Sequence, residues 1–306
     1  YFSTRLDKSV MWSDSGTAGQ SYRVQNGVLL ASGDPFGHYS LWSEVIDKMV
    51  ALADEYAWTL AVMGCGERAG ELWIKKTGMS ALHIGDEAII ETRNFTLEGS
   101  QMKNVREMNN KTKRLGYSVE VKTVNDLSDA ERELLKIKAV EWRYGAKERG
   151  FSMALDRFMN PLDDRETFTM ARKNGELMAF MSFSPWGKSG ISLDRMLRSR
   201  EADTGVNELI ISTTAEYARE HKIDYISLNF AAFRSIFEEA ERISAGLWLR
   251  IKRDVLRFFS KWVQVETLYR FNSKFQPEWN PRYLIYPGPT KLIEIGLAVG
   301  RAEGLI

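Results

Sequence analysis

The sequence predicts an α+β protein built from two similar domains, each with a central sheet. Residues 21–30 are typical of a β-hairpin, because Asn26-Gly27 joins two short runs and supplies the two positive φ angles of a type I′ turn. Apolar residues recur at helical spacing over about 40–57, which predicts a helix after the hairpin. A second Asn-Gly pair at 174–175 and a predicted helix from about 205 to 220 repeat this order.

Between these two units, Ser128-Asp129-Ala130-Glu131 has the form of a capping box and predicts a helix to about Tyr144. A chain of 306 residues is long enough for two domains. We expect their boundary near 150–165, between a domain of residues 1–160 and one of residues 161–306. The tight hairpins argue against a doubly wound parallel sheet. The sequence has no dinucleotide fingerprint and no phosphate loop, so a nucleotide cofactor is not expected.

The charges are balanced, with 42 Lys and Arg against 41 Asp and Glu, so attraction to a polyanion must come from local clusters. The single cysteine, Cys65, excludes an internal disulfide and fits a reducing compartment such as the cytoplasm. The sequence has no run of 18 apolar residues, and Tyr1 to Arg5 carries no apolar signal core. If a membrane is involved, we therefore expect this chain to lie against it.

Few residues are available for metal or covalent chemistry. The three histidines, His38, His83 and His221, lie far apart in the sequence without a second ligand at metal-binding spacing, so no metal site is predicted. The sequence lacks a Gly-x-Ser-x-Gly motif, and Cys65 lies among glycines that indicate a turn. Catalysis by carboxylates and arginines remains as the simplest expectation.

Residues 192–198 are the main candidates for such catalysis. They place Asp194, Arg195 and Arg198 at the end of a predicted strand, just before a loop. A surface charge cluster is the alternative interpretation of this group. Asn207-Glu208 then opens the next predicted helix, where an acidic residue in the first turn is also the ordinary complement of the helix dipole.

A basic tract lies between residues 241 and 274 of this neutral chain, with eight Lys and Arg against three Asp and Glu. Its apolar residues fall mostly on one face of a predicted helix, and Arg250, Arg253, Arg257 and Lys261 fall mostly on the other. This pattern is typical of a helix on an anionic lipid surface, and clustered cations also bind nucleic acid phosphates. Packing of the apolar face into the core is an equally supported alternative.

Seven short motifs occur in order between about residues 20 and 290. They are residues 32–37, 85–88, 95–99, 148–152, 192–194, 228–231 and 274–284. Together they resemble the C-terminal catalytic domain of the lysyl-phosphatidylglycerol synthase family, also called multiple peptide resistance factors. The runs 228–234 and 264–270 look most like the actinobacterial branch of that family.

The resemblance implies two tandem acetyltransferase-like (GNAT) domains with central mixed sheets, and a tunnel in which charged tRNA and lipid meet at one active site. It implies transfer of an amino acid from aminoacyl-tRNA to the hydroxyl of a membrane lipid, with phosphatidylglycerol as the expected acceptor. Lysine is the first choice of amino acid and alanine the second. No cofactor is expected, because an aminoacyl ester is already activated. The expected location is the cytoplasmic face of the cell membrane, after N-terminal transmembrane helices that lie outside this chain.

The resemblance also assigns roles to single residues. The family's Asp-x-Met-Arg motif falls on residues 194–197, where Leu197 replaces the arginine. We assign proton handling to Asp194 and the lipid phosphate or oxyanion to Arg198, with Arg195 as the alternative. The expected substrate-binding residues are Glu266, facing the ammonium of the amino acid, Asn229 and Glu208, and a structural hydrogen bond or ion pair is the alternative for each. The predicted tRNA or anionic-lipid surface comprises Arg250, Arg253, Arg257, Lys261, Lys274 and Arg282.

Two alternative functions come from other classes of protein. A CoA-dependent acyltransferase would need a glycine-rich turn for the pyrophosphate after the Asp194 strand, and only Gly205 lies in that neighbourhood. A non-catalytic module that binds tRNA or lipid is the second alternative. The substitution Asp194→Asn would separate the enzyme from the module, because it should abolish transfer while leaving binding intact.

Overall fold

The computed structural model describes residues 2–145, 150–151, 154–232 and 265–304. The strands are β1 (Ser9–Trp12), β2 (Ala18–Gln25), β3 (Val28–Ser32), β4 (Phe36–Gly37), β5 (Thr59–Gly66), β6 (Ser80–Glu91), β7 (Tyr117–Thr123), β8 (Thr167–Lys173), β9 (Glu176–Trp186), β10 (Gly190–Arg198), β11 (Tyr225–Ala232) and β12 (Glu278–Tyr286). The helices are α1 (Trp42–Glu55), α2 (Glu67–Thr77), α3 (Lys103–Arg114), α4 (Asp129–Glu141), α5 (Val206–Glu220), α8 (Val265–Ser273) and α9 (Leu292–Ala302).

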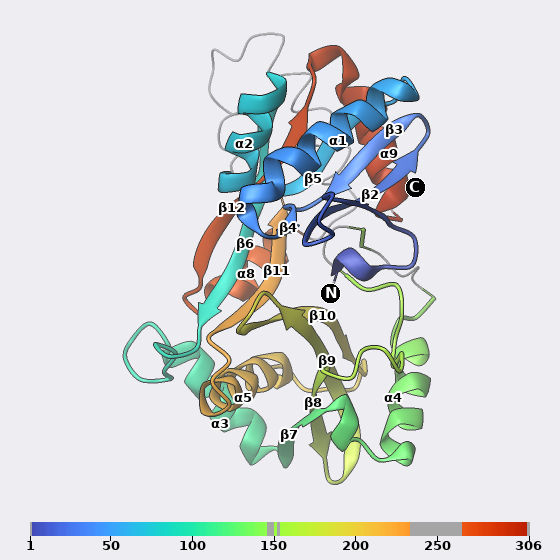
Figure 1. Ribbon diagram of the computed structural model, residues 1–306. Coiled ribbons are helices and arrows are strands. Elements are labelled where there is room, and N and C mark those ends of the chain that lie inside the picture. The colour runs from blue at the N-terminus through green and yellow to red at the C-terminus, as the bar shows by residue number, and fades with distance from the viewer. Residues whose placement is uncertain (1, 146–149, 152–153, 233–264, 305–306) are drawn as a thin grey trace.

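One mixed sheet runs through the molecule in the strand order β1-β2-β3-β5-β12-β6-β11-β10-β9-β8-β7, with β4 paired to β2 beside this path (Figure 1). Successive residues of a strand point to opposite faces, and β3 shows the result. Leu29 and Ala31 pack towards α1 and α2, whereas Val28 and Leu30 pack towards α9. Helices therefore cover both faces of the sheet, which confirms the predicted α+β class. Within the described residues, every helix is too short or too polar to cross a lipid bilayer.

The two halves of the sheet repeat one plan. In the first half, the antiparallel strands β1, β2 and β3 are followed by α1, and β5 then pairs parallel to β3. In the second half, the antiparallel strands β8, β9 and β10 are followed by α5, and β11 then pairs parallel to β10. The duplicated order predicted from the sequence is present, with one difference: the first Asn-Gly turn joins β2 to β3, whereas the second joins β8 to β9.

The halves exchange strands where they meet. β12, near the end of the chain, lies between β5 and β6, while β6 pairs with β11 of the second half (Figure 1). Residues of α3, β7 and α4 pack into the cores of the second half, and α9 packs into that of the first. The packing units therefore do not follow the expected division into residues 1–160 and 161–306. Residues 103–141 contribute to the second half and residues 278–302 to the first, because strand pairing joins segments far apart in the sequence.

Local turn and capping signals produced the expected conformations. Both Asn-Gly pairs, 26–27 and 174–175, have positive φ at each residue, as a type I′ turn requires. The backbone N–H of Ser128 donates to Glu131 Oε2 at 2.9 Å, and the backbone N–H of Glu131 donates to Ser128 Oγ at 3.3 Å. The capping box is therefore closed, and α4 begins at the predicted residue.

Candidate active site

The candidate site lies where two central strands of the second half separate. β10 and β11 pair in parallel at Gly190–Tyr225, Ile191–Ile226 and Ser192–Ser227, and their pairing ends there. Beyond this point, among the described strands, β10 pairs only with β9 and β11 only with β6. Each strand also has an irregularity just past the last pair, between Leu193 and Arg195 in β10 and between Ser227 and Phe230 in β11. Bulges re-aim side chains, and these two place Asp194 and Asn229 at the separation.

Asp194 is buried at this separation. Its side chain is 0% exposed, its Oδ1 accepts a hydrogen bond from Leu155 N at 2.7 Å, and its Oδ2 contacts the guanidinium of Arg195. Arg195 in turn donates from Nη2 to the carbonyl of Arg157 at 3.0 Å and lies over the ring of Phe158 at 4.9 Å. The carboxylate is thus held by a charged partner and a backbone amide, which fixes its orientation.

Arg195, and not Arg198, contacts Asp194. Because of the bulge, Asp194 stands out of register, and Arg195 lies opposite Ser182 of β9. Arg198 is exposed at the last position of β10, about 13 Å from Asp194 along an extended strand. Arg195, the alternative to Arg198 that the sequence suggested, therefore lies closer to Asp194 than Arg198 does.

Asn229 and Glu208 make contacts within the protein. Asn229 has a φ of 67° and donates from Nδ2 to the carbonyl of Leu193 at 3.1 Å, which links β11 to β10 across their separation. Glu208 lies in the first turn of α5, and its side chain is 7% exposed. It accepts from Lys274 Nζ at 2.7 Å, so a predicted substrate-binding residue is paired with a residue predicted for the tRNA or lipid surface. Glu266 belongs to α8.

The remaining basic residues of the predicted surface fall in two groups. Arg250, Arg253, Arg257 and Lys261 lie outside the described residues. Arg282 is described, but its side chain is only 14% exposed, so it does not lie on an open surface as the sequence predicted. The reason is the position of β12, which lies between β5 and β6 in the middle of the sheet.

Arg282 belongs to a buried polar network that the sequence did not predict. Its Nε donates to Oε2 of Glu87 at 3.0 Å, and its Nη1 lies 3.7 Å from Oδ2 of Asp34. Glu87 is 0% exposed and also accepts a hydrogen bond from Ser227 of β11. Burial disfavours the charged guanidinium, but Glu87 and Asp34 hold the pKa of Arg282 above its ordinary value. Three of the motifs that carry the family resemblance meet here, and this convergence is the signal that could have indicated the network.

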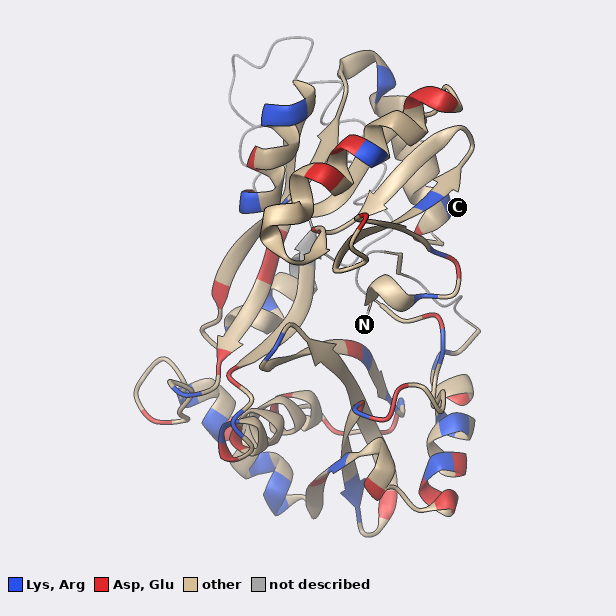
Figure 2. Cartoon of the chain, viewed as in Figure 1, with Lys and Arg blue, Asp and Glu red and all other residues tan. Residues whose placement is uncertain are grey.

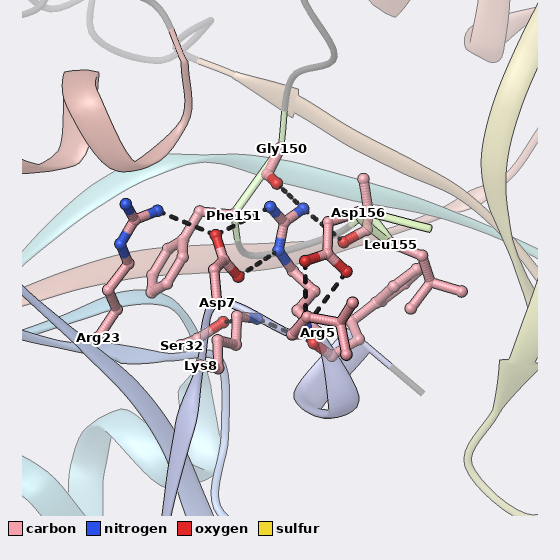
Figure 3. A network of polar contacts seen from close by, with 12 residues as sticks. Arg5, Asp7, Lys8, Arg23, Ser32, Gly150, Phe151, Leu155 and Asp156 are labelled. Atoms are coloured by element: carbon pink, nitrogen blue, oxygen red, sulfur yellow. Dashed lines mark hydrogen bonds and ion pairs between the residues drawn. The ribbon is translucent and has the colours of Figure 1, made fainter. Parts of the chain in front are cut away.

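The N-terminal residues hold the segment that donates to Asp194 (Figure 3). Arg5 donates from Nη1 to the carbonyls of Gly150 and Ala154, and it is paired with Asp7 at 2.9 Å. The backbone N–H of Leu6 donates to Asp156 Oδ2 at 3.0 Å. Gly150, Ala154 and Asp156 are therefore held by hydrogen bonds on both sides of Leu155, whose amide donates to Asp194.

Lys8 lies in the same network. Its Nζ donates to Ser32 Oγ at 2.8 Å and to the carbonyl of Phe2 at 3.0 Å, and it lies 4.8 Å from the ring centre of Phe151. Burial, followed by the charge of Arg5, lowers the pKa of Lys8 to about 7.

Figure 2 shows a second basic region on α3, where Lys103, Arg106, Lys111, Lys113 and Arg114 lie on one short helix.

Residues 1–286 match the family model described as phosphatidylglycerol lysyltransferase, C-terminal. This chain belongs to that family. The resemblance found in the sequence motifs is confirmed, and the match extends over both halves of the sheet. The buried Asp194 with its arginine therefore lies within the region that defines the family.

Curated relatives agree with this assignment. The lysylphosphatidylglycerol biosynthesis bifunctional protein LysX of Nocardia farcinica is 42% identical over 307 aligned residues, and the protein of the same name from Rhodococcus jostii is 44% identical. Both alignments cover the whole of this chain. They cover 27% and 28% of the relatives, so the chain spans about a quarter of the length of the curated relatives that it matches.

Two solved structures share the fold. L-PGS from Bacillus licheniformis has a TM-score of 0.84 at 22% identity, and a C-terminal domain (DUF2156) from Agrobacterium fabrum has a TM-score of 0.84 at 21% identity. Each match covers 98% of this chain and 90% of the other. At these identities the likeness concerns the fold, in which the two halves and the exchanged strands form one unit.

Proposed function

We propose that this chain catalyses the transfer of an amino acid from aminoacyl-tRNA to a hydroxyl group of phosphatidylglycerol, with lysine as the first choice of amino acid and alanine as the second. The observation that carries the proposal is the buried Asp194, oriented by Leu155 and Arg195 where β10 and β11 separate. The names of the family and of the relatives, which concern lysylphosphatidylglycerol, support the choice of lipid and amino acid.

The reaction needs little from the protein beyond orientation and charge. The lipid hydroxyl oxygen attacks the carbonyl carbon of the aminoacyl ester, and its proton passes to the Asp194 carboxylate. The ester bond to tRNA then breaks, and the same proton passes to the ribose oxygen that leaves. Arg195 supports the negative charge that develops on the carbonyl oxygen. General base catalysis of this kind contributes about 10²–10⁴-fold to a rate, and an oriented charge adds to it.

We place the substrates on opposite sides of the separated strands. The excess of basic residues over 241–274 supports a site for tRNA phosphates or anionic lipid. Glu266 is the residue we assign to the ammonium of the amino acid. A carboxylate that faces the second, side-chain ammonium of a lysyl group would favour lysine over alanine. The proposed location is the cytoplasmic face of the cell membrane, following N-terminal transmembrane helices that lie outside this chain.

The direct test supplies the chain with tRNAs that carry a radiolabelled amino acid, and with vesicles of defined lipids. We expect label in the lipid fraction with lysyl-tRNA and phosphatidylglycerol, less label with alanyl-tRNA, and none with phosphatidylcholine, which has no hydroxyl acceptor. A parallel sample with labelled acetyl-CoA tests the CoA-dependent alternative. Label transferred from acetyl-CoA, with none from any tRNA, would contradict the proposal.

A further inference from the structure

Asp194 and two further buried carboxyl groups, Asp163 and Glu166, lie close together, and among the described residues two arginines are paired with them. Asp163 is 2% exposed and accepts from Arg157 Nε at 2.6 Å and from its Nη2 at 2.7 Å. Asp194 is paired with Arg195. Glu166 is 1% exposed, and within the described residues its Oε1 has no hydrogen-bond partner. Among the described residues, the third carboxyl group is therefore buried without an ion pair of its own.

The strand register places Glu166 on the same side of the sheet as Arg195. Phe168 of β8 pairs with Ser182 of β9, and Ser182 pairs with Arg195 of β10. Glu166 lies two residues before Phe168, and residues two apart point to the same face. Its backbone is also fixed, since its N–H donates to the carbonyl of Asp163 at 3.1 Å. Glu166 therefore faces the region that contains the Asp194–Arg195 pair.

A second full negative charge at this depth would be costly. Removing an ionised carboxyl from water costs several kcal/mol unless a cation and hydrogen bonds compensate for it. Asp194 is already paired with Arg195, and Asp163 is paired with Arg157. Burial, and after it the charge of Asp194, raise the pKa of Glu166 to about 8, while Arg195 and Ser182 oppose this rise and Asp163 adds to it.

We propose that Glu166 is a positioning residue for Asp194. Glu166 remains protonated while Asp194 is ionised, so Glu166 does not compete with Asp194 for the Arg195 guanidinium. The carboxyl groups around Arg195 then carry one negative charge against one positive charge. If Glu166 loses its proton, it competes for the same guanidinium and adds a repulsive charge beside the base. Arg195 then turns away from Asp194, and the orientation of the proposed base is lost.

The groups that face Glu166 come from three segments. Arg157 and Asp163 belong to the loop before β8, Asp194 and Arg195 belong to β10, and Ser182 belongs to β9. Asp163 and Asp194 are each paired with an arginine, so among the described residues Glu166 is the acid of this group without such a pair. Above a pH of about 8 the same geometry would hold one charge too many.

The proton on Glu166 can be measured without any substrate. Infrared difference spectra of the wild type minus Glu166→Gln at pH 7 should contain the carbonyl band of one protonated carboxylic acid, and this band should disappear as the pH passes about 8. The exposed Glu176 is the matched control, since the difference for Glu176→Gln should contain a carboxylate band instead. A carboxylate band at pH 7 in the Glu166 difference would overturn the proposal.

The positioning role rests on the proposed function and is tested by transfer. At pH 7, Glu166→Gln should transfer label within about threefold of wild type, because a neutral side chain of the same shape replaces a neutral one. Between pH 7 and pH 9 the wild type should lose about tenfold in rate as one group titrates, whereas Glu166→Gln should not. Equal losses in both proteins would overturn the role.

The two measurements separate the two proposals. If lysyl transfer is absent from every sample while the infrared band behaves as expected, the proposed function fails and the protonated Glu166 stands. If transfer occurs and Glu166→Gln abolishes it at pH 7, the function stands and the positioning role fails, because an ionised Glu166 would then be required.

Discussion

Two aspartates occupy matching positions in the two halves of the sheet, and their surroundings differ. Asp34 follows Ser32, where the parallel pairing of β3 and β5 ends, and Asp194 follows Ser192, where the parallel pairing of β10 and β11 ends. The Asp34 side chain is 35% exposed and accepts from Gly66 N at 2.6 Å. The Asp194 side chain is 0% exposed. The duplicated plan therefore supplies two acids, and burial distinguishes the one that we propose as the base.

Each half also contains an arginine and a glutamate, arranged differently. In the first half, Nε of Arg282 lies 3.0 Å from Oε2 of the buried Glu87, and its Nη1 lies 3.7 Å from Oδ2 of Asp34. The arginine there is therefore paired more closely with the glutamate than with the aspartate. In the second half, Arg195 contacts Asp194, and Glu166 is paired with no cation in the part of the chain that the structure describes. From this comparison we propose that such a set of residues serves stability in the first half and catalysis in the second.

The largest expected effect on stability comes from the first half. The substitution Glu87→Gln leaves Arg282 buried without its main counter-charge, and breaking a buried ion pair costs about 3 kcal/mol or more. We expect urea denaturation to show a loss of about this size in the free energy of unfolding. The exposed control Glu176→Gln should change it by less than about 0.5 kcal/mol. A loss for Glu87→Gln as small as that of the control would mean that Asp34 alone compensates Arg282.

The next effect separates the two arginines of β10. The substitution Arg195→Met removes the cation that contacts Asp194, and we expect the rate of lysyl transfer to fall by about 100-fold. Arg198→Met changes an exposed residue at the end of the same strand and should lower the rate by less than about threefold. Initial rates with saturating lysyl-tRNA provide the measurement. The reverse ranking would return the role to Arg198, as the sequence alone suggested.

The smallest effect concerns pH and Lys8, which contacts Ser32 beside the first aspartate. The pKa of Lys8 falls to about 7 in the folded chain, mainly through burial, so between pH 7 and about 10.5 the unfolded chain binds more protons. The contribution of Lys8 to stability therefore rises with pH in this window. We expect the unfolding free energy of wild type minus Lys8→Met to increase by about 1 kcal/mol per pH unit above pH 7. A difference that stays constant or falls would contradict this.

Local signals made much of the fold predictable. The Asn-Gly turns, the capping box at Ser128 and the helices near 40–57 and 205–220 depend on residues within a few positions of one another, and each is present. The exchange of β6 and β12 depends on pairing between residues about 200 positions apart, as between Glu87 and Asn280. No local pattern carries that information, so the division at residue 160 missed it.

The candidate site was predictable only in part. Asp194 was found from its motif, and the structure places it in a buried position. The choice between Arg195 and Arg198 depended on a bulge, which one inserted residue creates and which strand alternation alone does not reveal. Arg282 was grouped with the surface cations, although its strand lies inside the sheet.

The most direct test of the central claim compares the two aspartates in a single-turnover reaction. Asp194→Asn and Asp34→Asn are measured with pre-bound lysyl-tRNA and phosphatidylglycerol vesicles, and tRNA and vesicle binding are measured in the same samples. We predict that Asp194→Asn slows transfer by about 10³-fold with binding unchanged, while Asp34→Asn stays within about tenfold of wild type. Transfer by Asp194→Asn at the wild-type rate would contradict the assignment of Asp194 as the base.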